Sequence, residues 1–254
     1  MLLRLISISY GLYLLLPIAL VCVGSVGQTW TNTLLPEGFT LSWFVALWQD
    51  VSMRRAFFSS LTLALCTCVL STLLSVPLSY YLYKNGRGAK AVATGLIASM
   101  PIAVPTITLA FGYLLVFNSD WLPWQGSFGL LIAAHTMQTM PYLTNTLLSD
   151  LRHLKLDQLE QAAATLGASP AQRFFGIVLP NLGHSLISGL AMVSALSIGE
   201  FGLSNLLSSF SNRTYPVVLL QAFYGATGLA CAATVVLLLL AAMASLISTY
   251  FAKR

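Results

Sequence analysis

The sequence predicts an all-α integral membrane protein with six transmembrane helices. Of its 254 residues, 57% are hydrophobic and only 7% are charged, whereas soluble domains carry about 25% charged residues. About 20 apolar residues in a helix suffice to cross the hydrocarbon core of a bilayer. Five stretches of at least this length contain no charged residue, and a sixth is shorter. The six stretches are Leu5–Val26, Ala56–Tyr83, Ala91–Ser119, Trp121–Ser149, Leu182–Gly199 and Leu229–Tyr250.

The first stretch has features of a secretory signal, because Arg4 precedes an apolar run that ends in small residues. At roughly 22 residues the run is longer than the apolar region of most signals, and further spans follow it. We therefore expect a retained anchoring helix over residues 5–26. No long linker or internal repeat is visible, so residues 1–254 are predicted to form a single membrane domain.

Basic residues near the ends of the spans predict the orientation. With the N-terminus inside, nine Lys and Arg residues fall on the inner side and three on the outer side. The inner set is Arg4, Lys84, Arg87, Lys90, Arg152, Lys155, Arg173, Lys253 and Arg254, and the outer set is Arg54, Arg55 and Arg213. Cytoplasmic loops of membrane proteins are enriched in basic residues, so both termini are expected in the cytoplasm.

The polar side chains form no recognisable catalytic or metal-binding set. The four cysteines lie within predicted spans and are interpreted as packing residues. No His, Cys, Asp and Glu residues have the spacing of metal ligands, and no Ser–His–Asp set can be defended. The net charge of +5 is scattered along the chain, which argues against binding to nucleic acid. No catalytic residue, metal or cofactor is therefore expected.

The segment Asp150–Gly183, between the fourth and fifth spans, predicts two short helices. Asp157 can cap the first helix, with Glu160 at the third helical position to complete the cap. Gly167 stands where a left-handed residue commonly ends a helix. Apolar residues recur between these points at helical spacing: Leu159, Ala162, Ala163 and Leu166.

A second helix is predicted immediately afterwards. Ser169 is a capping residue, Pro170 suits the first helical position, and Gln172 completes a capping box. Pro180 is expected to end this helix. Since nothing in the segment would activate a nucleophile, we interpret the two helices as a surface that docks into a groove of another protein.

This segment resembles the EAA loop of the permease subunits of binding-protein-dependent ABC importers. The family pattern is E-A-A-x3-G-x9-I-x-L-P, and its spacing is matched throughout. The residues at the seven motif positions are Gln161, Ala162, Ala163, Gly167, Ile177, Leu179 and Pro180. Gln161 replaces the first residue of the pattern, and an acid stands one position earlier, at Glu160. The departure argues against a salt bridge from the first motif position.

The resemblance implies that the loop is a coupling helix seated in a separate ATPase subunit, with Glu160 and the seven motif residues forming the coupling site. The chain has no G-x4-G-K-[ST] phosphate loop, so ATP would be bound by that partner and this chain would not be an enzyme. The other implied partners are an extracytoplasmic solute-binding protein and a second permease subunit, identical or, as we favour, homologous. The implied location is the bacterial inner membrane.

The resemblance extends over roughly residues 56–246. The spacing of Pro101, Pro105 and Gly112 is similar to a third-span pattern of these permeases. The segment Pro36–Leu41 resembles permeases for phosphonates, polyamines and ferric iron, and Ser197–Gly202 resembles permeases for phosphonate and molybdate. These likenesses favour a small polar solute, with a phosphonate such as 2-aminoethylphosphonate first, followed by polyamine and ferric iron.

Four residues within the predicted spans are candidates for the translocation pathway. Glu200 is the only acid in a span, and a charge there should face a cavity or a partner. It could act in the pathway as a gate or could hydrogen-bond structurally to hydroxyls or backbone. His135 is more readily explained as a packed, hydrogen-bonded residue than as a substrate contact. Pro101 and Pro105 predict either a packing kink or a bent helix that lines the pathway.

Three other functions are alternatives for a sequence of this composition. A secondary transporter usually shows internal repeats and several charges at the membrane midplane, and this chain has one such acid. A membrane-embedded enzyme should show a catalytic cluster at one interface. A non-transporting assembly subunit is the third alternative, and the coupling-loop pattern disfavours all three.

Overall fold

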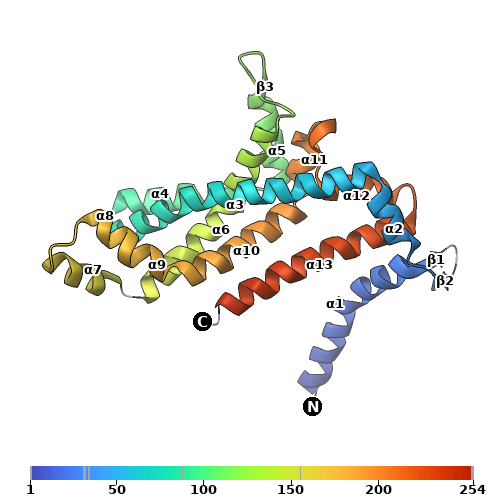
Figure 1. Cartoon of the computed structure of the whole chain (residues 1–254), viewed down its shortest axis with the longest axis horizontal. Helices are drawn as coiled ribbons and strands as arrows, with labels where there is room; N and C mark the ends of the chain where they lie inside the picture. The colour runs from blue at the N-terminus through green and yellow to red at the C-terminus, as the bar shows by residue number, and fades with distance from the viewer. Residues whose placement is uncertain (1, 31–32, 34, 87, 155, 253–254) are drawn as a thin grey trace.

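The protein, seen here as a computed structural model, is an elongated bundle of long helices (Figure 1), which confirms the predicted all-α fold class. The structure describes residues 2–30, 33, 35–86, 88–154 and 156–252. The first half contains α1 (Leu2–Val26), β1 (Gly27–Thr29), β2 (Glu37–Phe39), α2 (Ser42–Gln49), α3 (Val51–Asn85), α4 (Ala89–Ala103), α5 (Thr106–Phe117), β3 (Asn118–Ser119) and β4 (Leu122–Pro123). The strands form two short antiparallel hairpins, β1–β2 and β3–β4.

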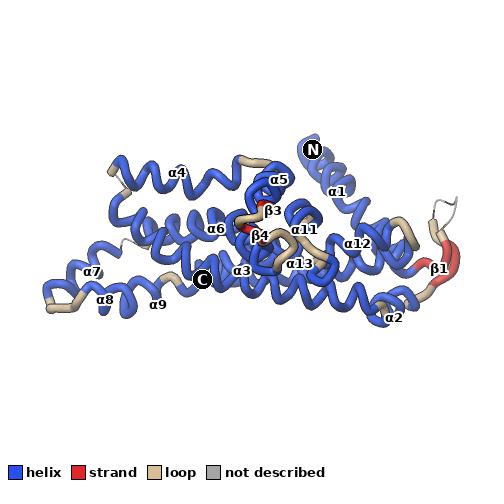
Figure 2. Tube along the Cα trace, turned by 90° about the horizontal axis from the view of Figure 1, so that it is seen from above, coloured by secondary structure: helices blue, strands red, loops and turns tan. Residues whose placement is uncertain are grey.

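The second half is helical. It contains α6 (Phe128–His153), α7 (Leu156–Thr165), α8 (Pro170–Arg173), the π-helical segment η1 (Phe174–Val178), α9 (Leu179–Asn181), α10 (Gly183–Gly199), α11 (Gly202–Leu207), the 3-10 segment η2 (Phe210–Asn212), α12 (Tyr215–Phe223) and α13 (Thr227–Ala252). Helices α3, α6 and α10 pack on one another, α13 packs on α10, and α1 lies against α13. Figure 2 shows α4 running beside α6 on the flank of this bundle.

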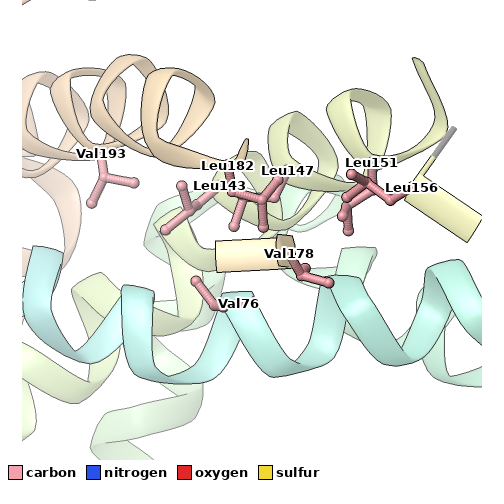
Figure 3. Packing of buried hydrophobic residues seen from close by; sticks show 8 residues of the cluster. All are labelled: Val76, Leu143, Leu147, Leu151, Leu156, Val178, Leu182 and Val193. Carbon is pink, nitrogen blue, oxygen red and sulfur yellow. The ribbon is translucent and has the colours of Figure 1, made fainter. Parts of the chain in front are cut away.

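A layer of aliphatic side chains joins the bundle at the end where α7 to α9 lie (Figure 3). Its buried members are Val76, Leu143, Leu147, Leu151, Leu156, Val178, Leu182 and Val193. Close helix contact is possible here because Gly189 has no side chain. A Cβ atom at this position would lie 2.5 Å from Cδ1 of Leu143, so α10 can approach α6 only with glycine or a shift of Leu143.

Within the part of the chain that the structure describes, three helices are long and apolar enough to cross a membrane by themselves: α1, α3 and α13. Two bent pairs, α4 with α5 and the α8–α9 stretch with α10, would raise the number to five if each pair counts as one span. The remaining predicted span corresponds to α6. The count of six therefore stays a prediction. Four basic residues used for the orientation, Arg87, Lys155, Lys253 and Arg254, lie outside the described residues.

The third predicted span is interrupted rather than kinked. Helix α4 ends at Ala103, α5 begins at Thr106, and the two axes differ by 104°. Pro105 is the cause, because its ring disfavours helical geometry in the preceding residue, and Val104 is accordingly extended. Pro101, by contrast, lies within α4. Of the two alternatives, a packing kink does not describe a break of 104°, whereas a sharply bent span does. Helix α5 projects from the side of the bundle together with α11 (Figure 1).

Candidate functional site

The α7–α9 segment (Leu156–Asn181) contains the predicted turn between two short helices. Gly167 has φ +86°, a left-handed conformation that costs other residues free energy. The amide of Ala168 donates to the carbonyl of Ala163, and the amide of Gly167 donates to the carbonyl of Ala164, both at 3.0 Å. The long bond from Ala168 is typical of a Schellman C-cap, so the predicted role of Gly167 in ending the helix is confirmed.

The start of the second helix also agrees with the prediction. The Ser169 hydroxyl accepts from the amide of Gln172 at 3.3 Å, and the Gln172 side chain accepts from the amide of Ser169 at 2.8 Å. Pro170 occupies the first turn, where its missing N–H costs nothing. The helical stretch that begins at Pro170 ends at Asn181, one residue beyond Pro180, and the chain then bends by 64° into α10. The predicted end at Pro180 is therefore correct to within one residue.

The predicted cap of the first helix is wrong. Helix α7 begins at Leu156, so Asp157 lies inside it. The carboxylate of Asp157 instead binds Nζ of Lys84, at the end of α3, at 2.7 Å. This hydrogen bond is the main reason that the pKa of Asp157 lies below its ordinary value. The Asp157 amide donates to the hydroxyl of Tyr83 at 3.3 Å.

Glu160 connects the α7–α9 segment to α3. Its side chain is only 2% exposed and forms an ion pair with Lys84. The hydroxyl of Tyr80 donates to Oε1 of Glu160 at 2.6 Å. Tyr80 also packs edge-on against Phe174 of η1, with ring centroids 5.2 Å apart. We call the contact among Glu160, Lys84 and Tyr80 the Glu160 ion-pair site. Sequence reasoning missed both α3 partners, although their spacing of four residues places them on one helix face.

Apolar contacts also hold the α7–α9 segment against α3 and α6. Leu156 of α7 and Val178 of η1 are buried among side chains of α3 and α6 (Figure 3). Ile177 and Leu179 pack against this cluster. Two of the motif residues therefore act as internal anchors.

The remaining motif residues lie on or near the outer face of the segment. Gln161, Ala162, Gly167 and Pro180 are exposed, and Ala163 is half-buried. Large apolar side chains of the same segment are also exposed: Leu166 is 89% exposed, and Leu159 and Phe175 are exposed as well. We call Leu159, Gln161, Ala162, Leu166, Gly167 and Phe175 the outer face. Exposed apolar groups of this size, grouped on one segment, commonly mark a surface for another protein.

A second polar site lies where α6, α10 and α11 meet. His135 of α6 is completely buried. Its Nδ1 lies 2.9 Å from the Ser197 hydroxyl of α10, and its Nε2 lies 3.1 Å from the Ser204 hydroxyl of α11. Both ring nitrogens thus have hydroxyl partners. The interpretation of His135 as a packed, hydrogen-bonded residue agrees with this geometry.

Glu200 lies between α10 and α11, with Oε2 3.8 Å from Nε2 of His135. Its two carboxylate oxygens accept from the amides of Leu203 and Ser204, at 3.0 and 3.1 Å. The side chain therefore caps the N-terminus of α11, where amides lack intrahelical partners. We call Glu200, His135, Ser197 and Ser204 the helix-break site. The roles of the two serines were not anticipated, although Ser197 lies in the segment that resembled phosphonate permeases.

Helix α5 reaches the same region. Gln138 of α6 donates to the hydroxyl of Thr106 at 3.3 Å. A Cβ atom added to Gly202 would lie 3.5 Å from Thr106 and 3.3 Å from the Glu200 carboxylate. Pro105, next to Thr106, is thus close to the helix-break site, whereas Pro101 lies on the other side of the break, within α4. The structure brings together three of the four pathway candidates.

Comparison with known proteins identifies the family. Residues 75–254 match the family described as binding-protein-dependent transport system inner membrane component. PhnV of Salmonella typhimurium, a proposed permease for 2-aminoethylphosphonate, is 28% identical over 84% of this chain and 79% of its own. The putrescine permease PotI of Escherichia coli is 27% identical over 71% of this chain and 66% of its own. The molybdate/tungstate permease WtpB of Pyrococcus abyssi is 31% identical over 69% of this chain and 68% of its own.

Solved structures show the same fold. A bacterial ABC transporter that imports the polysaccharide alginate superposes with a TM-score of 0.73 at 15% identity, covering 98% of this chain and 94% of that one. The alginate transporter in complex with its pentasaccharide-bound periplasmic protein gives a TM-score of 0.72 at 18% identity, covering 98% and 91%. At these identities the likeness concerns the fold alone. The family match covers most of the chain, and the chain therefore belongs to the binding-protein-dependent transport system inner membrane components.

Proposed function

We propose that this chain lines the pathway of an ATP-driven importer and is coupled to a separate ATPase through the outer face of the α7–α9 segment. The strongest support is that one side of this segment is buried against the bundle and the other side is exposed. Glu160, Leu156 and Val178 hold it to the bundle, while Leu166 and its neighbours are exposed. A docked subunit would bind the outer face and would displace the anchored side with it.

The Glu160 ion-pair site would transmit this displacement from α7 to the transmembrane helix α3. A buried carboxylate separated from its partners is costly, so α7 and the end of α3 should move together. Helix α3 runs unbroken for 35 residues and packs on α6 and α10. Movement of α7 would therefore shift the helices that carry the helix-break site.

At the other end of this route, we propose that the helix-break site borders the pathway. The chain leaves α10 at Glu200, and α11 then packs against α5. Interrupted helices with satisfied backbone groups are tolerated in membranes where they line a cavity or are buried in protein. On this proposal Glu200 sets the geometry of the break, and His135 positions it from α6.

The relatives suggest the solute, and the family suggests the partner proteins. PhnV supports 2-aminoethylphosphonate or a related phosphonate as the solute, and PotI supports a polyamine as the second candidate. The solute-binding protein would deliver the solute from outside, and a second permease subunit, homologous rather than identical, would complete the pathway. The distribution of basic residues supports cytoplasmic placement of both termini and of the α7–α9 segment.

The solute can be tested directly. Cells that express the complete transporter should take up radiolabelled 2-aminoethylphosphonate, and unlabelled 2-aminoethylphosphonate should compete more strongly than putrescine or molybdate. Cells in which only this chain is deleted are the control. Uptake of labelled putrescine that is unaffected by the phosphonate would overturn the phosphonate assignment and leave the coupling proposal intact.

Coupling can be tested at Gly167. A Cβ atom there would meet no other atom, so a substitution acts through the backbone alone. Gly167→Val should distort the turn, since the left-handed conformation costs about 1–2 kcal/mol per non-glycine residue and β-branching adds to this. We expect normal insertion but loss of uptake and weaker association with the ATPase, measured by co-purification.

The matched control is Gly167→Asn, because asparagine tolerates the left-handed region. It should retain most of the uptake. If Gly167→Val transports normally, the docking role of the outer face is refuted.

The role of Glu200 can be tested with two variants. Glu200→Ala removes both acceptors of the α11 cap, and loss of such a cap costs about 0.5–2 kcal/mol. Glu200→Gln retains one acceptor. We therefore expect the melting temperature in detergent to fall most for Ala and less for Gln, with uptake following the same order. A charge-dependent gate predicts another result: both variants would fold, assemble with the ATPase and lose uptake equally.

A further inference from the structure

A basic pocket lies where the end of α3, the start of α4 and the end of α6 meet. Its volume is about 1000 Å³, and its lining includes Lys84, Lys90, Arg152 and Asp157. Lys84 is paired with both Asp157 and Glu160, so these three groups together carry a net charge of −1. Among the residues that the structure describes, Lys90 and Arg152 form no ion pair with a carboxylate. The five groups therefore sum to +1, and Lys90 and Arg152 are the cations left to pair with a ligand.

The pocket lies at the level of a membrane interface. The uncharged run Ala56–Tyr83 ends at Lys84, the run Ala91–Ser119 begins just after Lys90, and the run Trp121–Ser149 ends shortly before Arg152. The uncharged runs of α3 and α4 thus meet their first charges at this pocket, and that of α6 is followed by Asp150 and then by Arg152, which lines the pocket. Tyr81 and Tyr83 also line it, and tyrosine is enriched where lipid headgroups lie. This placement holds whichever face of the membrane the pocket occupies.

An apolar groove continues from the pocket into the membrane. It has a volume of about 320 Å³, lies between α4 and α6, and shares Leu82 and Arg152 with the basic pocket. Its apolar lining includes Val92, Leu96, Ala98 and Leu148, and Ser99, Thr144 and Asn145 add polar atoms. Gly95 also lines the groove, and a Cβ added there would make only an ordinary van der Waals contact with a Leu82 methyl, at 3.7 Å.

We propose that this composite site binds an anionic phospholipid, with the phosphate between Lys90 and Arg152 and one acyl chain in the groove beside Gly95. The basic pocket and the apolar groove together match a ligand with an anionic headgroup and an apolar chain. Two positive charges complement a headgroup with a net negative charge, whereas a zwitterionic headgroup contributes a cation of its own. The groove lies at membrane depth, where lipid chains are the surrounding solvent. Basic pockets between transmembrane helices bind anionic headgroups in this manner.

The site is independent of the transported solute and of the outer face. It does have a structural link to the Glu160 ion-pair site, because Lys84 and Asp157 belong to both. A lipid bound here would lie between the ends of α3, α4 and α6 and would hold α4 beside the bundle.

The test is native mass spectrometry of the full-length chain together with the subunits that co-purify with it in detergent. Dioleoyl phosphatidylglycerol should bind and dioleoyl phosphatidylcholine should bind much more weakly. Glycerol 1-phosphate, which has the charge without the chains, should not be retained. In the double variant Lys90→Gln with Arg152→Gln, phosphatidylglycerol should bind about thirtyfold more weakly. Each basic residue near the membrane surface contributes about 1 kcal/mol to binding an anionic lipid, and the loss of two corresponds to about this factor.

Two further variants make the result specific. Arg54→Gln with Arg55→Gln removes the same charge at the other end of α3 and should bind phosphatidylglycerol normally. Gly95→Leu fills the groove, leaves both cations in place and should also weaken binding. Equal binding of the two lipids, or undiminished binding by the Lys90 and Arg152 variant, would overturn the proposal. Displacement of lipid by a second permease subunit that covers the groove would overturn it as well.

Discussion

The burial of one carboxylate, that of Glu160, is the constraint on which the rest of this structure depends. A buried charge is tolerated only with a partner, and breaking a fully buried pair costs about 3–5 kcal/mol. The cost is smaller here because Lys84 retains contact with water. Tyr80 and Lys84 belong to α3, so α7 cannot leave the bundle without separating these groups. The ion pair also determines which residues of α7 face outward, and hence which side of the segment is available to a partner.

The helix-break site solves a different physical problem. A helix that stops within a membrane leaves amides without partners, and lipid supplies none. Glu200 accepts from two of these amides, and His135 joins the hydroxyls of α10 and α11. The two sites are connected through unbroken helices, since α3 and α6 run from the Glu160 ion-pair site toward the region of α5 and α11 (Figure 1). Transport by this family requires such a connection between an ATPase outside the membrane and a pathway within it.

Much of this architecture was accessible from the sequence, and the failures have clear causes. Uncharged runs predicted the membrane class, and Gly167, Ser169 and Gln172 predicted the turn because local backbone rules determine it. The partners of Glu160 could not be predicted in this way, since Tyr80 and Lys84 lie about 80 residues earlier in the chain and meet it only in three dimensions. The same is true of Ser197 and Ser204 around His135. The cap assigned to Asp157 failed because α7 begins at Leu156, so Asp157 lies inside the helix and its carboxylate binds Lys84 instead.

The central claim, that the outer face docks an ATPase, is tested most directly by cross-linking. Leu166→Cys would be introduced after replacing the native Cys22, Cys66, Cys68 and Cys231 with alanine, and the transporter would be treated in membranes with a thiol-to-amine reagent. Leu65→Cys is the control, since Leu65 is 67% exposed but lies within the apolar run of α3. If the outer face docks the ATPase, Leu166→Cys should cross-link to the co-purifying ATPase, and Leu65→Cys should not. Absence of the Leu166→Cys product in a transporter that still imports its solute would contradict it.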